Sequence, residues 1–123
     1  MDKSSNSKPV YDLEKRTFEF AKSVRKVLRK INPDIIIDED KKQLTKASGS
    51  VGANYIEANE SLSKKDFSYR IKICRKEAKE SGFWLRLIED QVDIIDIRKK
   101  IIELIQEADE LKKIFSSIYE KSK

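Results

Sequence analysis

The sequence predicts an all-α fold, an antiparallel up-down four-helix bundle, and three observations carry this prediction. Apolar residues recur at spacings of three and four over long stretches, which is typical of amphipathic helices. Charged residues make up 40% of the 123 residues and hydrophobic residues 38%. Glycine and proline account for only three and two positions, fewer than a turn-rich β fold needs. We expect one domain, with a flexible segment at 1–8, the bundle at 9–121 and a tail at 122–123.

The first helix is expected to begin at Pro9 and to end before Pro33, because proline suits a first helical turn and cannot continue a helix. The next segment, 35–37, holds three isoleucines but has no second strand to pair with. We interpret it as an apolar plug over one end of the bundle. The predicted buried face of the first helix is Leu13, Thr17, Phe20, Ala21, Val24, Leu28 and Ile31.

The second helix is expected to open at Asp38, Glu39 or Asp40, since acidic side chains favour a helix N-terminus. Gly49 and Gly52 each cost about 1 kcal/mol relative to alanine inside a helix. Their presence beside other small residues indicates a close approach of a neighbouring helix. The predicted apolar stripe of this helix is Leu44, Ser48, Val51, Tyr55, Ala58 and Leu62.

The third helix is expected to start after Ser63, which with Asp66 resembles a capping box. A break is needed between Gln91 and Ile97 for the chain to fold back, with Asp93 or Asp96 as the N-cap of the fourth helix. The predicted core positions of the third helix are Phe67, Ile71, Cys74, Ala78, Ser81, Leu85, Ile88 and Val92. Those of the fourth helix are Ile101, Leu104, Ala108, Leu111, Phe115 and Ile118.

More apolar residues are present than one core face uses. Ile73, Trp84 and Leu87 share a second face of the third helix, and the other helices add similar positions. Two interpretations remain open. Wide apolar stripes serve a closely packed core in many globular helices. Alternatively, this second face is an interface between subunits, where aromatic residues are enriched. The additional positions elsewhere are Phe18, Val27, Ile102, Ile105 and Ile114.

Catalytic chemistry finds little support in the residue types present. The chain contains no histidine, so the usual nucleophilic triads and the Glu-x-x-His motif of di-iron bundles are absent. Cys74 falls on a core face and is expected to be an inert buried thiol. We therefore expect no enzyme, no metal and no cofactor. No apolar run approaches the roughly 20 residues of a membrane span, so a cytoplasmic protein without membrane contact is expected.

The charge pattern is more informative than the search for catalytic groups. Segment 8–30 has eight basic and three acidic residues, and segment 64–79 has seven and two. One interpretation is a solvated face whose cations also complement a helix dipole. The other is a basic surface that neutralises the phosphates of RNA or DNA, with Tyr11, Tyr55 or Tyr69 stacking on bases. The candidate nucleic-acid contacts are Lys22, Arg25, Lys26, Arg29, Lys30, Lys64, Lys65, Arg70, Lys72 and Arg75.

Several short motifs resemble a known family. The main ones are 48–58 (Ser-Gly-Ser-Val-Gly-Ala-Asn-Tyr-Ile-Glu-Ala), 63–67 (Ser-Lys-Lys-Asp-Phe) and 76–81 (Lys-Glu-Ala-Lys-Glu-Ser). Segments 11–14, 84–85, 108–111 and 114–117 also fit. Together they resemble the four-helix bundle proteins encoded in intervening sequences of bacterial 23S rRNA genes. The chain departs from the family pattern with Lys46 in place of the commoner arginine and Gly82 in place of a larger residue.

The resemblance implies an all-helical bundle that assembles as a homopentamer, and it favours the subunit-interface interpretation of Ile73, Trp84 and Leu87. It also implies similarity to accessory variability proteins of diversity-generating retroelements, which bind a reverse transcriptase and nucleic acid. The expected partners are thus further copies of the chain, RNA or DNA, and a reverse transcriptase or another protein. An interaction scaffold without nucleic-acid contact is the alternative function. The resemblance further suggests a structural polar network of Asn54, Glu57, Glu77 and Glu80.

Overall fold

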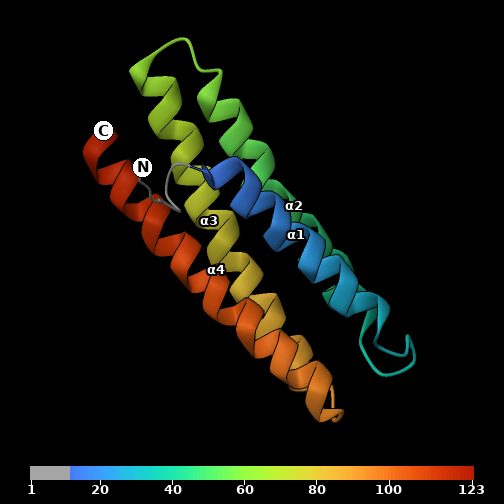
Figure 1. Ribbon diagram of the computed structural model, residues 1–123. Coiled ribbons are helices and arrows are strands. Elements are labelled where there is room, and N and C mark those ends of the chain that lie inside the picture. The colour runs from blue at the N-terminus through green and yellow to red at the C-terminus, as the bar shows by residue number, and fades with distance from the viewer. Residues whose placement is uncertain (1–11) are drawn as a thin grey trace.

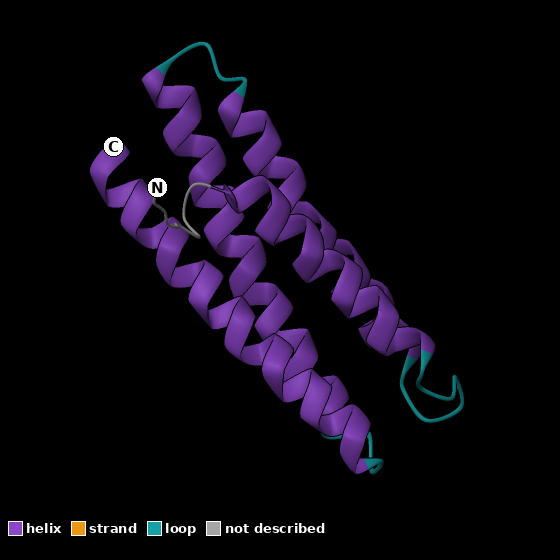
Figure 2. Cartoon of the chain, viewed as in Figure 1, coloured by secondary structure: helices purple, strands orange, loops and turns teal. Residues whose placement is uncertain are grey.

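The computed structural model describes residues 12–123, and these form four helices and no strand (Figures 1 and 2). Three loops, 30–37, 60–63 and 90–94, turn the chain back along itself at alternate ends of the molecule (Figure 2). The expected flexible segment and the expected helix start at Pro9 lie outside the described residues. The helices are α1 (Leu13–Arg29), α2 (Asp38–Asn59), α3 (Lys64–Glu89) and α4 (Ile95–Ser122).

The helices pack in cyclic order around one core. α1 packs against α2 and α4, and α3 packs against the same two helices. α1 and α3 therefore lie on one diagonal of the bundle and α2 and α4 on the other. This order decides which surface side chains can meet.

The core lies where the apolar periodicity predicted it. Phe115, Leu111, Leu85 and Val51 are fully buried, as are most other predicted core positions. The prediction is wrong for Leu62, which is fully exposed (100%) because α2 ends at Asn59 and the residue lies in the following loop. For Val27 the structure supports the first of the two interpretations, a wide stripe that serves the core, because it is buried beside Leu28 in the last turns of α1.

The close approach predicted from the glycines of α2 occurs at Gly52. A Cβ atom added there would lie 2.9 Å from Thr17 Oγ1 and 3.2 Å from Thr17 Cβ, on α1. Thr17 is buried, and its hydroxyl donates a hydrogen bond to the Leu13 carbonyl oxygen at 2.7 Å. At Gly49 the nearest group is instead the Arg25 guanidinium, 3.1 Å from such a Cβ.

The loops confirm one predicted cap and correct another. Ser63 Oγ accepts a hydrogen bond from the Asp66 backbone N–H at 3.0 Å, as the capping-box pattern predicted. The break between α3 and α4 falls within the expected stretch. However, Ile94 and not Asp93 or Asp96 occupies the N-cap of α4, and no side chain caps that helix.

The apolar plug is smaller than predicted. Of the three isoleucines at 35–37, only Ile36 is buried, whereas Ile35 and Ile37 are exposed. The loop that carries them is held by Gln91, whose Oε1 accepts a hydrogen bond from the Ile37 N–H at 2.9 Å. Loops 30–37 and 90–94 therefore meet at one end of the bundle.

Candidate nucleic-acid interface

The ten basic residues predicted to bind nucleic acid lie on separate surfaces in the single chain. Those of α1 and those of α3 belong to helices on one diagonal, which do not lie side by side. The basic half of α1 also leads into loop 30–37, whereas the basic start of α3 follows loop 60–63 at the other end (Figure 1). Because the chain turns back at each loop, the end of α1 and the start of α3 cannot meet.

One of these surfaces is a basic groove between α3 and α4. It consists of two adjoining hollows of about 740 and 610 Å³ that share Tyr69 and Lys72. None of the described residues that line it is acidic. We call this surface the α3/α4 groove; its lining is Lys64, Lys65, Ser68, Tyr69, Lys72, Ile73, Arg75, Lys76, Lys79, Lys112, Tyr119, Ser122 and Lys123.

Tyr119 organises the cations of this groove. Lys72 Nζ, Arg75 Cζ and Lys123 Nζ lie 5.6, 5.4 and 5.8 Å from the centroid of its ring. Cation–π attraction at such distances holds the three side chains around the ring without neutralising their charge. Lys123 also forms an ion pair with Glu120 at 3.1 Å, as Lys112 does with Asp109 at 3.3 Å. Between residues 12 and 123, no ion pair engages Lys72 or Arg75, so their charge remains available to an anionic partner.

The groove has the length and the aromatic group that a nucleic-acid strand needs. Ser68 donates hydrogen bonds to the carbonyl oxygen and the hydroxyl of Ser122, at 2.8 and 2.9 Å, which fixes the start of α3 to the end of α4. The basic stretch of α3 from Lys64 to Lys79 is about 22 Å long at 1.5 Å per residue. That length matches roughly six phosphates of one strand of a duplex. Tyr69 is 61% exposed in the middle of the groove, where a base can stack on it.

The groove also contains residues that are not among the ten candidate contacts. Lys76 and Lys79 belong to the predicted basic segment 64–79 and continue the spacing of Lys72 and Arg75 by threes and fours. Lys112 and Tyr119 lie on α4 and join the groove only through tertiary packing. Arg70, by contrast, is turned toward α2, where its Nη1 donates a hydrogen bond to Asn54 Oδ1 at 3.1 Å.

The basic residues of α1 border a second, more apolar groove between α1 and α2. Phe18 and Ile56 are 63% and 50% exposed there, and the groove has a volume of about 600 Å³. Arg25 is partly buried and donates hydrogen bonds to the carbonyl oxygens of Ala21 and Thr45. We call this surface the α1/α2 groove; its lining is Glu14, Thr17, Phe18, Ala21, Lys22, Arg25, Lys26, Arg29, Gly49, Gly52, Ala53 and Ile56. Lys30 lies outside it, in a smaller hollow between α1 and α4.

The four residues of the predicted polar network are not joined to one another. Asn54 Nδ2 donates to the Ser50 carbonyl oxygen at 2.9 Å, and its side-chain oxygen accepts from Arg70. Glu57 and Glu80 are exposed. Among the residues from 12 onward, no hydrogen bond links any two of the four, and the interhelical contact is the bond between Asn54 and Arg70.

The pKa of the Glu77 carboxyl group, on α3, is shifted by its surroundings. Burial, and then repulsion from Glu80, raise its pKa above the ordinary value, although Lys76 and Lys46 oppose the shift. A carboxyl whose pKa is higher in the folded than in the unfolded state stabilises the fold at low pH and loses that contribution as the pH rises. We therefore expect Glu77→Gln to raise the free energy of unfolding at pH 7, and the gain to vanish near pH 3.5, where both states are protonated. Urea unfolding at several pH values measures this, and a gain that is equal at all pH values would contradict it.

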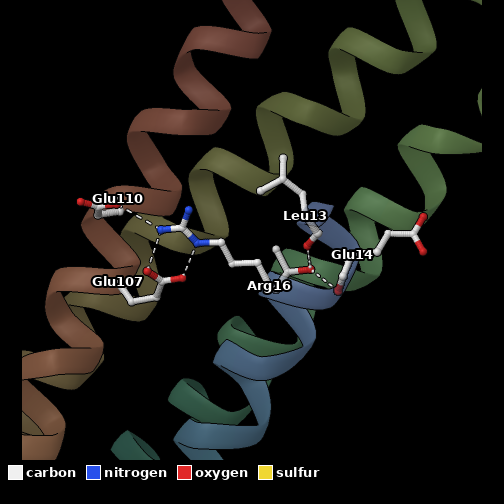
Figure 3. Close-up of polar contacts among 6 residues, drawn as sticks. Leu13, Glu14, Arg16, Glu107 and Glu110 are labelled. Carbon is white, nitrogen blue, oxygen red and sulfur yellow. Dashed lines mark hydrogen bonds and ion pairs between the residues drawn. The ribbon is translucent and has the colours of Figure 1, made fainter. Parts of the chain in front are cut away.

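A cluster of charged groups that the sequence did not reveal joins α1 to α4. Arg16 Nε and Nη2 donate to the two carboxylate oxygens of Glu107 at 2.7 and 2.9 Å, and Nη2 also donates to Glu110 at 3.1 Å (Figure 3). The hydrogen bond to Glu107 is the main cause that raises the pKa of Arg16. The bidentate pair fixes the orientation of the guanidinium. Arg16 is thus a structural cation and does not belong to either groove.

The remaining candidate residues are also accounted for. Cys74 is fully buried, and burial raises the pKa of its thiol to about 12, as expected of an inert core thiol. Within residues 12–123, no group of three potential metal ligands gathers. In the same part of the chain, none of the four helices is long and apolar enough to cross a membrane.

The predicted interface residues of α3 differ in exposure. Ile73 and Trp84 are half-buried, and Trp84 packs against the core and meets Phe83 edge-on at 5.0 Å. Leu87 is exposed. Trp84 therefore serves the core of the single chain, whereas Ile73 lines the α3/α4 groove.

Comparison with known proteins places the chain in a family. Residues 11–117 match the model of the 23S rRNA-intervening sequence protein family. A crystal structure from Bacteroides thetaiotaomicron, of a protein with unknown function from the S23 ribosomal protein family, is similar with a TM-score of 0.72 and 27% sequence identity. The similarity covers 86% of this chain and 96% of that one. No curated protein matches. The chain therefore belongs to the 23S rRNA-intervening sequence protein family.

Proposed function

We propose that this protein is a non-enzymatic helical bundle that binds RNA through the α3/α4 groove. In this proposal the protein acts as a homo-oligomer of five copies. The observation that carries the proposal is the acid-free lining of that groove, in which cations from α3 and α4 surround Tyr119. Such a surface neutralises phosphates without reading base edges. The apolar and aromatic patches left exposed on the single chain support assembly.

The groove is favoured over the basic residues of α1 for two reasons. The described residues of its lining include no acid, whereas Glu14 lies in the α1/α2 groove. Its cations come from two helices and line two hollows that adjoin at Tyr69 and Lys72.

Charge reversal in the groove tests the proposal. We expect Lys76→Glu with Lys79→Glu to weaken binding of a structured RNA about 10–100-fold at low salt, because two phosphate contacts become repulsive. The slope of log affinity against log salt should fall by about two. The measurement is fluorescence anisotropy with labelled RNA over a range of salt concentrations.

The matched control reverses two exposed lysines of α4 outside both grooves, Lys99 and Lys121. It changes the net charge equally and should weaken binding much less. Equal losses in the two double variants would mean that only net charge matters, which would overturn the assignment of the groove. Wild-type protein that does not bind RNA at low salt would overturn the function itself. The alternative function is a scaffold for another protein. It would then be favoured if a partner protein stays bound to this protein after nuclease treatment.

A further inference from the structure

The loop between α3 and α4 presents apolar side chains to solvent where local structure gains nothing from them. Ile94 occupies the N-cap of α4 and Ile95 its first position, and they are 55% and 68% exposed. Ser, Thr, Asp or Asn at an N-cap stabilises a helix by about 1 kcal/mol relative to apolar residues. Two exposed isoleucines at a helix start are therefore unfavourable in the single chain. A partner surface that covers the two isoleucines would offset this cost by removing their side chains from water.

The same loop is held rigidly. Gln91 Nε2 donates hydrogen bonds to Asp40 Oδ2 and the Leu87 carbonyl oxygen, each at 2.8 Å. Val92 is buried in the core. Arg98 donates to Glu89 Oε2 at 2.8 Å across the loop. A rigid loop loses little conformational entropy when it binds a partner.

The charge of segment 90–96 itself is negative, although Arg98, Lys99 and Lys100 follow it on α4. Asp90, Asp93 and Asp96 are all exposed beside the two isoleucines. We call residues 90–96 the acidic tip. Its charge is unfavourable for RNA and for anionic lipid, so the complementary partner is a basic surface with an apolar centre.

The α1/α2 groove of the same protein has that character. Phe18 and Ile56 supply exposed apolar surface, and Lys22, Lys26 and Arg29 lie along α1 beside them. In the single chain, the isoleucines of the acidic tip and the apolar residues of the groove are all exposed. The apolar surfaces of the tip and of the groove therefore stay in contact with water until a second copy covers them.

We propose that the acidic tip of one copy docks into the α1/α2 groove of the next copy. This inference rests on the homo-oligomeric part of the proposed function and names the surfaces that carry it. Ile94 and Ile95 cover Phe18 and Ile56, while the aspartates pair with Lys22, Lys26 and Arg29. Because the tip and the groove are different parts of the surface, the contact is heterologous, and it repeats from copy to copy until a ring closes.

A charge-swap experiment tests the contact. We expect Asp93→Lys with Asp96→Lys, and separately Lys26→Glu with Arg29→Glu, each to raise the dissociation constant of assembly about 10-fold or more. A quadruple variant that carries both reversals should assemble as the wild type does, because every reversed tip then meets a reversed groove in a ring of any number of copies. Light scattering over a range of concentrations measures the mass of each sample, starting from a chain of 14.4 kDa.

The Lys99→Glu and Lys121→Glu double variant is the matched control, and it should assemble as the wild type does. Wild-type assembly that both reversed variants retain would overturn the contact, and so would a quadruple variant that fails to assemble. A wild-type protein that is monomeric up to high concentration would overturn it as well. RNA binding measured on the same samples separates the two proposals. If a monomeric protein binds RNA through the α3/α4 groove, the RNA-binding proposal is supported and the tip contact is contradicted.

Discussion

Replacement of Phe115 by alanine is expected to lower the free energy of unfolding by about 3–5 kcal/mol, the range for large aromatic residues in a core. Phe115 is fully buried on α4, and its ring lies 5.7 Å from that of Tyr55 on α2, on the same diagonal of the bundle. Truncation thus removes apolar contact at the centre of the core and leaves a cavity there. Urea denaturation followed by circular dichroism, at a fixed protein concentration, measures the loss.

The matched control is Phe83→Ala, which removes the same side chain from the surface of α3. Phe83 is about half exposed, and in the described part of the chain its aromatic neighbour is Trp84, with ring centroids 5.0 Å apart and ring planes at 81°. Loss of this aromatic pair costs about 0.5–1.5 kcal/mol, which is well below the loss expected at Phe115. Similar losses for the two variants would mean that the core does not lie where the structure places it.

Gly52→Ala is expected to lower the free energy of unfolding by up to about 2 kcal/mol net, although alanine favours a helix by about 1 kcal/mol over glycine. The new Cβ would lie 2.9 Å from Thr17 Oγ1. Thr17 cannot yield easily, because it is β-branched, buried and hydrogen-bonded to the Leu13 carbonyl oxygen. α1 and α2 must therefore move apart, and overpacking of this kind typically costs 1–3 kcal/mol.

Gly49→Ala, one turn earlier on the same helix, provides the contrast. Its new Cβ would meet Arg25 Nη2 at 3.1 Å, the far end of a flexible side chain. We expect a net gain of about 0.5 kcal/mol, because helix propensity improves and Arg25 can shift. Thermal unfolding of both variants gives the comparison, and a loss at Gly49 as large as that at Gly52 would show that helix packing at Gly52 is not the cause.

The sequence by itself determined the helices and most of the core. Spacings of three and four residues place Phe115, Leu85 and Val51 on buried faces, because side chains of a helix repeat every 3.6 residues. Proline at 33 and the Ser63 cap act on their own neighbours in the chain. These features are local, so they can be predicted without knowledge of the neighbouring helices.

The ends of helices were less predictable. Leu62 fits the apolar spacing of α2, but the helix ends before it and leaves it exposed. Asp93 and Asp96 were the natural caps for α4, yet Ile94 holds that position. Where a helix stops depends on how the loop packs, and here Gln91 and the buried Val92 fix the loop.

Only the tertiary structure decided which charged residues act together. In the sequence, the basic segments of α1 and α3 look equivalent, but the cyclic order of the helices places them on one diagonal. The same packing brings Lys112 and Tyr119 to Lys72 and Arg75. The helix period tells which charged residues share one face of a helix. It does not tell which residues of another helix lie beside them, because that depends on which helix faces pack together. That choice is made by the buried contacts of the whole chain and is not visible in any one segment.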